Sequence, residues 1–142
     1  MDSYRSFVMN WFEKVWNQGD VSTLDCFMTD QTVFHGSDGV DLVGFEAFRA
    51  SQDRMRQFFS HFRCLVLNTT VEAAVLCSTV RIKAKHRATG KRVQFQAMNR
   101  VLFDSSGKIQ EAWDTIDWMS CLIQLNVIPP DFLTRCLQRS AP

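Results

Sequence analysis

The sequence RVQFQAMNRVLFDSSGKIQEAWDTIDW, residues 92–118, decides the fold. Along residues 92–103, apolar side chains recur at every second position and share one face of a predicted strand: Val93, Phe95, Ala97, Val101 and Phe103. The residues DSSG at 104–107 predict a hairpin turn, and residues 108–118 predict the returning strand. This period of two predicts an antiparallel pair of strands with one face toward an apolar interior.

Upstream of this hairpin the same period of two continues. Residues 62–68 and 74–86 predict two more strands, and residues 87–91 predict the turn into the next one. The strand at 74–86 places on one face the side chains of Leu76, Val80, Ile82 and Ala84. Another short strand is predicted at 32–35, before a loop that contains Gly36, Gly39 and Gly44.

The N-terminal part has a helical period instead. Residues 4–17 carry one broad apolar stripe made of Phe7, Val8, Trp11, Phe12, Val15 and Trp16. Gly19 ends this helix, and Asp20 or Ser22 can cap a short second helix. A longer helix is predicted over 45–59, with these residues directed inward: Phe48, Met55, Phe58 and Phe59.

Short C-terminal helices are expected near 120–125 and 131–138. Because helices come first and a run of antiparallel strands follows, the order predicts an α+β fold. The expected architecture is a cone-shaped, curved antiparallel sheet closed by the N-terminal helices. Such a sheet leaves a conical cavity, which is a typical ligand site.

The composition excludes several functional classes. The 142 residues fit one domain, and a net charge of +1 favours neither nucleic acid nor a membrane. No apolar stretch could span a bilayer and the N-terminus has no secretory cleavage pattern, so we expect a cytoplasmic protein. The five cysteines have no C-x-x-C spacing, which predicts neither a disulfide framework nor a zinc site. Twelve Phe and four Trp can line a pocket as well as fill a core.

Three polar residues interrupt apolar strand faces. Asn99 shares a face with Phe95 and Ala97. Asp114 shares a face with Ala112, Ile116 and Trp118. His86 follows Ile82 and Ala84 on their face. A buried carboxylate has a raised pKa and suits general acid–base chemistry near neutral pH. Two alternatives stay open. A bulge would turn these side chains to solvent, and Asp114 or Asn99 could instead be a hydrogen-bonded structural residue.

The three histidines give no metal signal, because their spacing does not match that of metal ligands. His35 could reach the cavity or cap the following loop. His86 lies beside a turn, which favours an exposed strand end, although its face makes it a candidate pocket residue. His61 begins a strand and is expected to be exposed.

Three stretches resemble the SnoaL-like polyketide cyclases (ester cyclases) of the nuclear-transport-factor-two-like superfamily. These are EKVWNQGD at 13–20 with Leu24-Asp25, TGKRVQF at 89–95, and GKIQEAWD at 107–114 with Asp117 and Gln124-Leu125. The last is the most specific, and together the three cover nearly the whole chain in the family's order. Residues 1–142 are therefore interpreted as one SnoaL-like domain with a C-terminal extension at about 127–142.

The resemblance implies a cystatin-like, cone-shaped α+β barrel that is usually a homodimer. Cyclases of this family close a ring in a polyketide ester by intramolecular aldol condensation, without a metal or an organic cofactor. Asp114 matches the family's acid–base aspartate. Asn99 stands nearest to the position of a facing histidine, and an amide cannot relay a proton. The tight turn from His86 to Thr89-Gly90 is also shorter than in the family, so part of the pocket rim is expected to be missing.

We therefore predict a cofactor-independent acid–base enzyme that acts on a hydrophobic carbonyl or ester small molecule by aldol cyclisation or isomerisation. Asp114 would move the proton and Asn99 would steady the enolate oxygen. Substrate binding is assigned to Trp11, Trp16, Phe34, His35, Phe59, His86 and Trp118. The alternatives are a non-catalytic small-molecule binding protein and a dimerising adaptor on the same fold. A homodimer is expected on the outer sheet face, where Met98 and Leu102 lie opposite Asn99.

Overall fold

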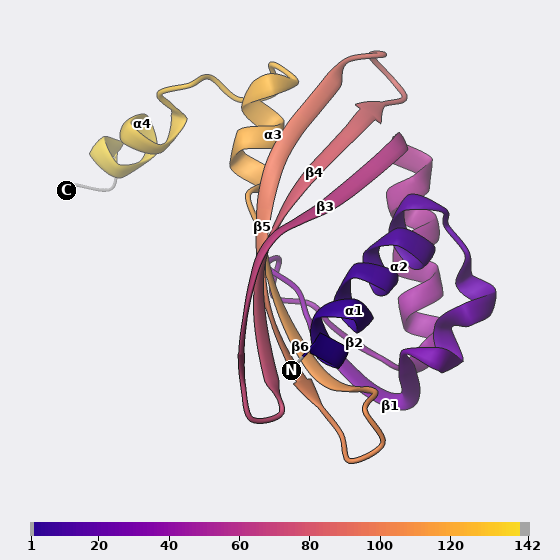
Figure 1. Ribbon diagram of the computed structural model, residues 1–142. Coiled ribbons are helices and arrows are strands. Elements are labelled where there is room, and N and C mark those ends of the chain that lie inside the picture. The colour runs from indigo at the N-terminus through magenta and orange to yellow at the C-terminus, as the bar shows by residue number, and fades with distance from the viewer. Residues whose placement is uncertain (1, 140–142) are drawn as a thin grey trace.

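The computed structural model describes residues 2–139 and contains one strongly curved six-stranded sheet (Figure 1). Its strands are β1 (Met28–His35), β2 (Asp41–Val43), β3 (Phe59–Glu72), β4 (Val75–His86), β5 (Arg92–Phe103) and β6 (Ile109–Ile116). Their order across the sheet is β2-β1-β6-β5-β4-β3. The pairing is antiparallel except between β1 and β6, which run parallel.

Helices cover one side of this sheet. Helix α1 (Asp2–Trp11) continues as a π-helical segment, η1 (Phe12–Asn17), before a 3-10 helix, η2 (Val21–Cys26). As the sequence predicts, Gly19 follows with a positive φ of 69°, and the Asp20 side chain caps η2 by accepting from the Ser22 amide. Helix α2 (Gly44–Phe58) lies beside α1, and Figure 1 shows both on the same side of the curved strands.

The core consists of two apolar clusters on the concave side of the sheet. The first joins α1, η1, η2 and α2 to the sheet around the fully buried Val15, Leu24 and Met28. The second contains Phe59, Phe62, Ala84, Val93, Phe95, Cys121 and Leu125. Each fully buried large apolar side chain contributes about 1.5–3 kcal/mol, so the two clusters together hold the helices against the sheet.

The α+β class and the curved sheet closed over by N-terminal helices are confirmed, although the sheet edges themselves do not meet. Strand β5 has the predicted bounds, whereas β2 was not predicted and β1 begins earlier than expected. The predicted helix over 45–59 ends at Phe58, which is 51% exposed, so the inward assignment of Phe58 was wrong. Phe59 is buried but already belongs to β3, where the chain changes from a helical to an extended path.

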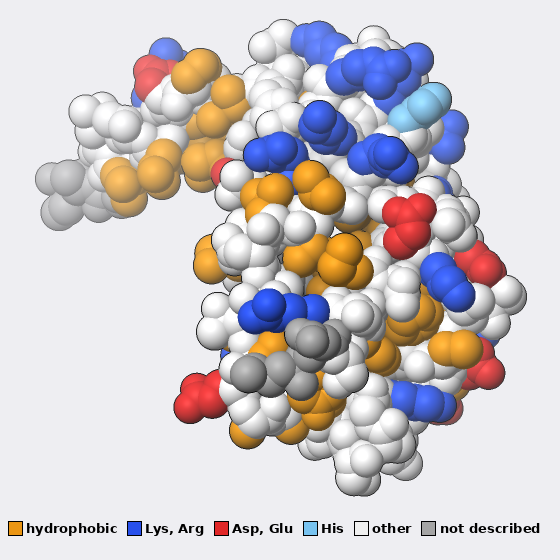
Figure 2. Space-filling view, in the orientation of Figure 1, with side chains coloured by type: hydrophobic (Ala, Val, Ile, Leu, Met, Phe, Trp, Pro, Cys, Tyr) orange, Lys and Arg blue, Asp and Glu red, His pale blue; other side chains and the backbone are white. Residues whose placement is uncertain are grey.

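The C-terminal helices differ in their contacts with the sheet. Helix α3 (Trp118–Gln124) packs on β5, and its Gln124 side chain bonds the backbone of Gln94 at both N–H and C=O. Helix α4 (Phe132–Arg139) stands apart in Figure 1, and Figure 2 shows hydrophobic side chains along this projecting arm. Within residues 2–139, no helix has the length and apolar character to cross a membrane.

Candidate functional site

A cavity of about 430 Å³ lies between the concave face of the sheet and the helices. Aromatic side chains from α1, η1, β1 and α2 form one wall, among them Trp11, Trp16, Phe34 and Phe48. Residues of β4, β5, β6 and the start of α3 form the opposite wall: Val80, Ile82, Phe95, Ala97, Asn99, Asp114, Ile116 and Trp118. A space of this size, mostly apolar with few polar groups, suits a small organic ligand.

The aromatic wall is organised by ring contacts. Trp11 stacks on Phe34 with ring centroids 5.9 Å apart and an interplanar angle of 14°, and its ring lies 5.2 Å from that of Phe48. On the other wall, Trp118 lies 5.4 Å from Phe95. Flat, rigid side chains on both sides favour a planar or aromatic ligand between them.

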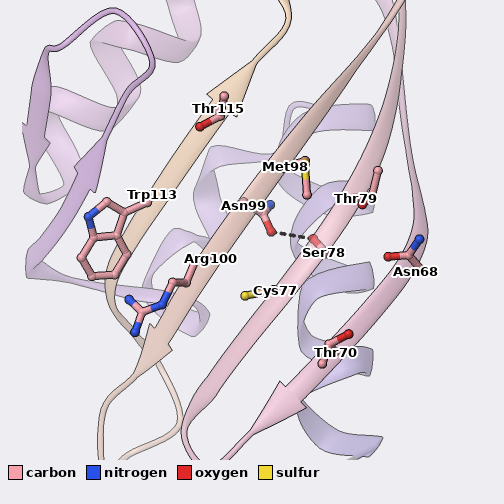
Figure 3. Close-up of a pocket in the computed structure, with 10 residues that line it drawn as sticks. All are labelled: Asn68, Thr70, Cys77, Ser78, Thr79, Met98, Asn99, Arg100, Trp113 and Thr115. Atoms are coloured by element: carbon pink, nitrogen blue, oxygen red, sulfur yellow. Dashed lines mark hydrogen bonds between the residues drawn. The ribbon is translucent and has the colours of Figure 1, made fainter.

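A row of three polar side chains crosses the inner face of the sheet. Ser78 of β4 pairs with Asn99 of β5, and Asn99 pairs in turn with Asp114 of β6. The register is regular through this row, because the irregularity between β5 and β6 falls later, at Leu102/Phe103. The Ser78 hydroxyl donates to Asn99 Oδ1 at 2.5 Å, and both residues are buried (Figure 3). The bulge that would have turned Asn99 and Asp114 to solvent is therefore absent from this part of the sheet.

Asp114 ends this row as a carboxyl group without a hydrogen-bond partner in the part of the chain that the structure describes. It keeps some accessible surface because it faces the cavity, but protein surrounds it on its other sides. Desolvation by burial raises the pKa of Asp114 from 3.8 to about 6. A carboxyl group that titrates near 6 is mostly ionised at neutral pH and still takes up a proton readily, which suits acid–base chemistry.

Six of the predicted site residues line this cavity: Trp11, Trp16, Phe34, Asn99, Asp114 and Trp118. Three others do not. Phe59 fills the second core cluster against Phe62 and Trp118, because β3 starts at this residue. His86 lies at the end of β4, where its Nδ1 is 2.9 Å from the Thr89 hydroxyl and its ring contacts Phe59.

His35 points to the outer side of the sheet. Its Nδ1 lies 2.8 Å from Asp41 and its Nε2 lies 2.6 Å from Glu111, while its ring stacks on Trp113. The pKa of His35 is raised, first by the hydrogen bond with Glu111 and then by the one with Asp41. This residue is at the end of β1, and the parallel pairing with β6 places it beside Trp113. Neither of the two sequence-based interpretations, cavity residue or loop cap, describes it.

Sequence reasoning missed several residues of the site. Ser78 does not line the cavity itself but bonds Asn99, which does. It shares the inward face with Leu76 and Val80, so the alternation of β4 could have predicted its orientation. Arg54 and Ser51 of α2 line the cavity together with the loop from Gly36 to Val40, and only the tertiary structure brings these segments together. Cys64 also lines it, but burial raises the pKa of this thiol to about 12, which rules out a thiolate nucleophile at neutral pH.

Two further observations bear on cofactors and partners. Among residues 2–139, no group of three or more His, Cys, Asp or Glu side chains is arranged to hold a metal ion. On the outer side of the sheet, a shallow hollow of about 350 Å³ is lined by residues that include Met98, Arg100 and Trp113 (Figure 3). The Arg100 guanidinium lies 4.7 Å from the centre of the Trp113 ring, so Arg100 faces outward.

Comparison with known proteins gives a family and a fold. The family model for the SnoaL-like polyketide cyclases matches residues 6–125. No curated protein sequence matches the chain significantly. The matched region ends with α3, so the segment that carries α4 lies outside it.

Solved structures share the fold at low sequence identity. AclR from Streptomyces galilaeus is 20% identical with a TM-score of 0.78, over 91% of this chain and 99% of that chain. IdmH from Streptomyces antibioticus, a candidate polyketide cyclase, is 18% identical with a TM-score of 0.78, over 87% and 98%. A protein with a ketosteroid isomerase-like fold from Catenulispora acidiphila, in complex with trimethylamine, is 11% identical with a TM-score of 0.75, over 83% and 90%. At these identities the likeness shows the fold alone.

Proposed function

Because this chain belongs to the SnoaL-like polyketide cyclase family, we propose that it is a cofactor-independent acid–base enzyme. Its substrate would be a hydrophobic small molecule with a carbonyl or ester group, and its reaction an aldol cyclisation or an isomerisation. One observation carries the proposal: Asp114 is a desolvated, unpartnered carboxyl group that faces an apolar cavity of about 430 Å³.

In an aldol cyclisation, the Asp114 carboxylate removes a proton from the carbon next to a carbonyl group. The electrons of the broken C–H bond form the enolate double bond, and the carbonyl oxygen takes the negative charge. The Asn99 amide donates a hydrogen bond to that oxygen. The enolate carbon then attacks a second carbonyl of the same molecule, and Asp114 returns its proton to the new alkoxide.

This mechanism asks one group to be both base and acid. Asn99 stands where the family resemblance places a histidine, and an amide can donate a hydrogen bond but cannot relay a proton. The pKa of about 6 for Asp114 makes the double role chemically reasonable, since the protonated and ionised forms differ little in free energy at neutral pH. In an isomerisation, Asp114 would remove a proton from one carbon of the substrate and return it to another carbon of the same molecule.

The test uses 2-acetylnaphthalene, a flat ketone with exchangeable methyl protons. NMR in D₂O would follow the replacement of these protons by deuterium with wild-type protein and with Asp114→Asn. We expect the wild type to accelerate the exchange, and the substitution to lower the protein-catalysed rate about a hundredfold or more, the usual scale for general acid–base catalysis. Binding of the ketone should persist in the variant, because Asn keeps the shape of Asp. Equal exchange rates for the two proteins would contradict the proposal.

Because the Asn99 amide cannot relay a proton, a second candidate function is that of a non-catalytic small-molecule binding protein. Such a protein would bind 2-acetylnaphthalene in the cavity and leave its exchange rate at the buffer value. A dimerising adaptor would bind no ligand there. Ala97→Trp fills the cavity from β5, so it should abolish binding under either ligand-based function.

A cytoplasmic homodimer completes the proposal. The five cysteines are all unpaired, which suits a reducing compartment.

Met98 is 63% exposed on the outer face of the sheet, where a large apolar side chain suits a second copy. Sedimentation should give a dimer for the wild type and a monomer for Met98→Glu. Val127→Glu is the matched control, because Val127 is 64% exposed but lies beyond α3. A wild-type monomer would exclude the dimer.

A further inference from the structure

The side chain of Asn99 has two chemically different ends, and its orientation decides what the cavity offers a ligand. An amide oxygen toward the cavity would accept hydrogen bonds and repel a carbonyl oxygen, whereas an amide NH₂ group would donate to it. In the structure Asn99 Oδ1 is directed at the Ser78 hydroxyl, which donates to it at 2.5 Å (Figure 3). The NH₂ group is the end that remains for the cavity.

The surroundings of Ser78 make this arrangement specific. Ser78 is 3% exposed, and its neighbours on the inward face of β4 are the fully buried Leu76 and Val80, which have no polar side-chain atoms. Within residues 2–139, the bond from Ser78 is the one side-chain hydrogen bond of Asn99. Reversing the amide would direct its NH₂ group at Ser78 and leave the oxygen facing the cavity beside the Asp114 carboxylate, an electrostatically unfavourable arrangement.

We propose that Ser78 is a positioning residue, which holds the Asn99 amide with its NH₂ group toward the cavity and so makes the site selective for ligands with a carbonyl oxygen. This inference rests on the proposed function, in which Asn99 is the donor to the enolate oxygen. Ser78 does not touch the ligand itself. It acts through Asn99, and the two side chains form a unit.

The experiment uses two probes of the same shape, 2-acetylnaphthalene and 2-isopropenylnaphthalene, which differ by an oxygen in place of a CH₂ group. Their dissociation constants are measured for the wild type, Ser78→Ala, Asn99→Ala and the double variant. The ratio of the two constants reports the hydrogen bond to the carbonyl oxygen, while general losses of packing or stability cancel. We expect Ser78→Ala to reduce the preference for the ketone about threefold to tenfold, the range for one hydrogen bond.

Two features separate positioning from a structural role. Asn99→Ala should reduce the ratio at least as much as Ser78→Ala, and the double variant should match Asn99→Ala, because the hydroxyl has no amide left to hold. Thr79→Val removes a neighbouring hydroxyl that follows Ser78 on β4, and it should leave the ratio unchanged. An unchanged ratio in Ser78→Ala, or an equal effect of Ser78→Ala with and without Asn99, would overturn the inference.

A second measurement needs no ligand. The ¹³Cγ resonance of Asn99 reports hydrogen bonding to its oxygen, and it should move upfield in Ser78→Ala and stay in place in Thr79→Val. An unmoved resonance would also overturn the inference. If neither probe binds the wild type while the resonance does move, the orientation of the amide stands and the proposed function as a carbonyl-binding enzyme fails, so the two failures are distinguishable.

Discussion

Strand β6 carries a carboxyl group on each face, and the two groups differ in their hydrogen-bond partners. On the outer face, Glu111 lies 2.6 Å from His35, whose second ring nitrogen lies 2.8 Å from Asp41. On the inner face, Asp114 has no hydrogen-bond partner among the described residues and faces an apolar cavity. A carboxyl group held by partners is part of the framework, whereas one without partners is available to a ligand. The difference lies in the neighbours that the fold supplies, because both side chains belong to one strand.

The same contrast decides what each group does to stability. The pKa of His35 is raised because Glu111 and Asp41 stabilise its protonated form, so the proton strengthens the folded state. The pKa of Asp114 is raised because burial penalises its charged form, so its ionisation weakens the folded state. Both pKa values are therefore raised, but for different reasons. Substitutions that remove the two effects should change the stability of the folded state in opposite directions.

The largest expected effect on stability is a gain from Asp114→Asn. The stabilising contribution of the neutral Asp114 is fully present below its unfolded-state value of about 4 and is lost as pH rises through its folded value of about 6. Above pH 6 the wild type carries a buried charge that the variant lacks. At pH 8 we expect Asp114→Asn to be more stable by about 1–3 kcal/mol, since one pKa unit corresponds to about 1.4 kcal/mol.

Urea unfolding at pH 8 and at pH 4 measures this gain, which should shrink toward zero at the lower pH. Glu111→Gln serves as the comparison from the outer face, where the loss of a charged partner of His35 should destabilise the protein at pH 6 and not stabilise it. If Asp114→Asn is instead less stable at pH 8, Asp114 is a structural ion partner and the contrast between the two faces is lost.

The next effect concerns activity. In the proposed mechanism the Asp114 carboxylate removes the proton, so the deuterium exchange of 2-acetylnaphthalene should rise with pH through a midpoint of about 6 and level off above 7. Between pH 5 and pH 7 the rise should be about tenfold, the change in the ionised fraction of a group with this pKa. Glu111→Gln should keep the same profile. A midpoint near 4 would mean that the cavity does not desolvate Asp114.

The strand period was sufficient to predict the inner face of β5 and β6. Asn99 and Asp114 lie where alternation placed them, because no bulge interrupts the pairing between Ala97 and Leu102. Ser78 was within reach of the same reasoning, but a small hydroxyl between apolar neighbours gives a weak signal. Its role depends on the partner across the strands, which one strand alone does not reveal.

The rest of the site depends on contacts between distant segments. His35 belongs to a strand whose parallel partner, β6, follows more than 70 positions later, so its outward stack on Trp113 has no local signal. Phe59 follows Phe58 directly at the boundary between α2 and β3, where composition does not show whether the helix continues. Because the strand begins at Phe59, its ring packs in the second core cluster. The cavity volume itself is set by how α1 and α2 pack over the sheet, which periodicity does not determine.

The smallest expected effect tests the outer face by itself. His35 in the unfolded chain titrates near 6.5, and its folded pKa is higher because of Glu111 and Asp41. The contribution of this cluster is therefore fully present below about pH 6.5 and is lost as pH rises through the folded pKa of His35. The melting temperature of Glu111→Gln should lie below that of the wild type at pH 6, and the two should converge toward pH 9. Asp131→Asn breaks an exposed pair with Arg135 that involves no histidine, so its difference from the wild type should stay constant from pH 6 to 9. If the difference in melting temperature between Glu111→Gln and the wild type is also constant from pH 6 to 9, the contact of Glu111 with His35 is no more than an uncharged hydrogen bond. The outer face of β6 would then hold its carboxyl group by geometry and not by charge.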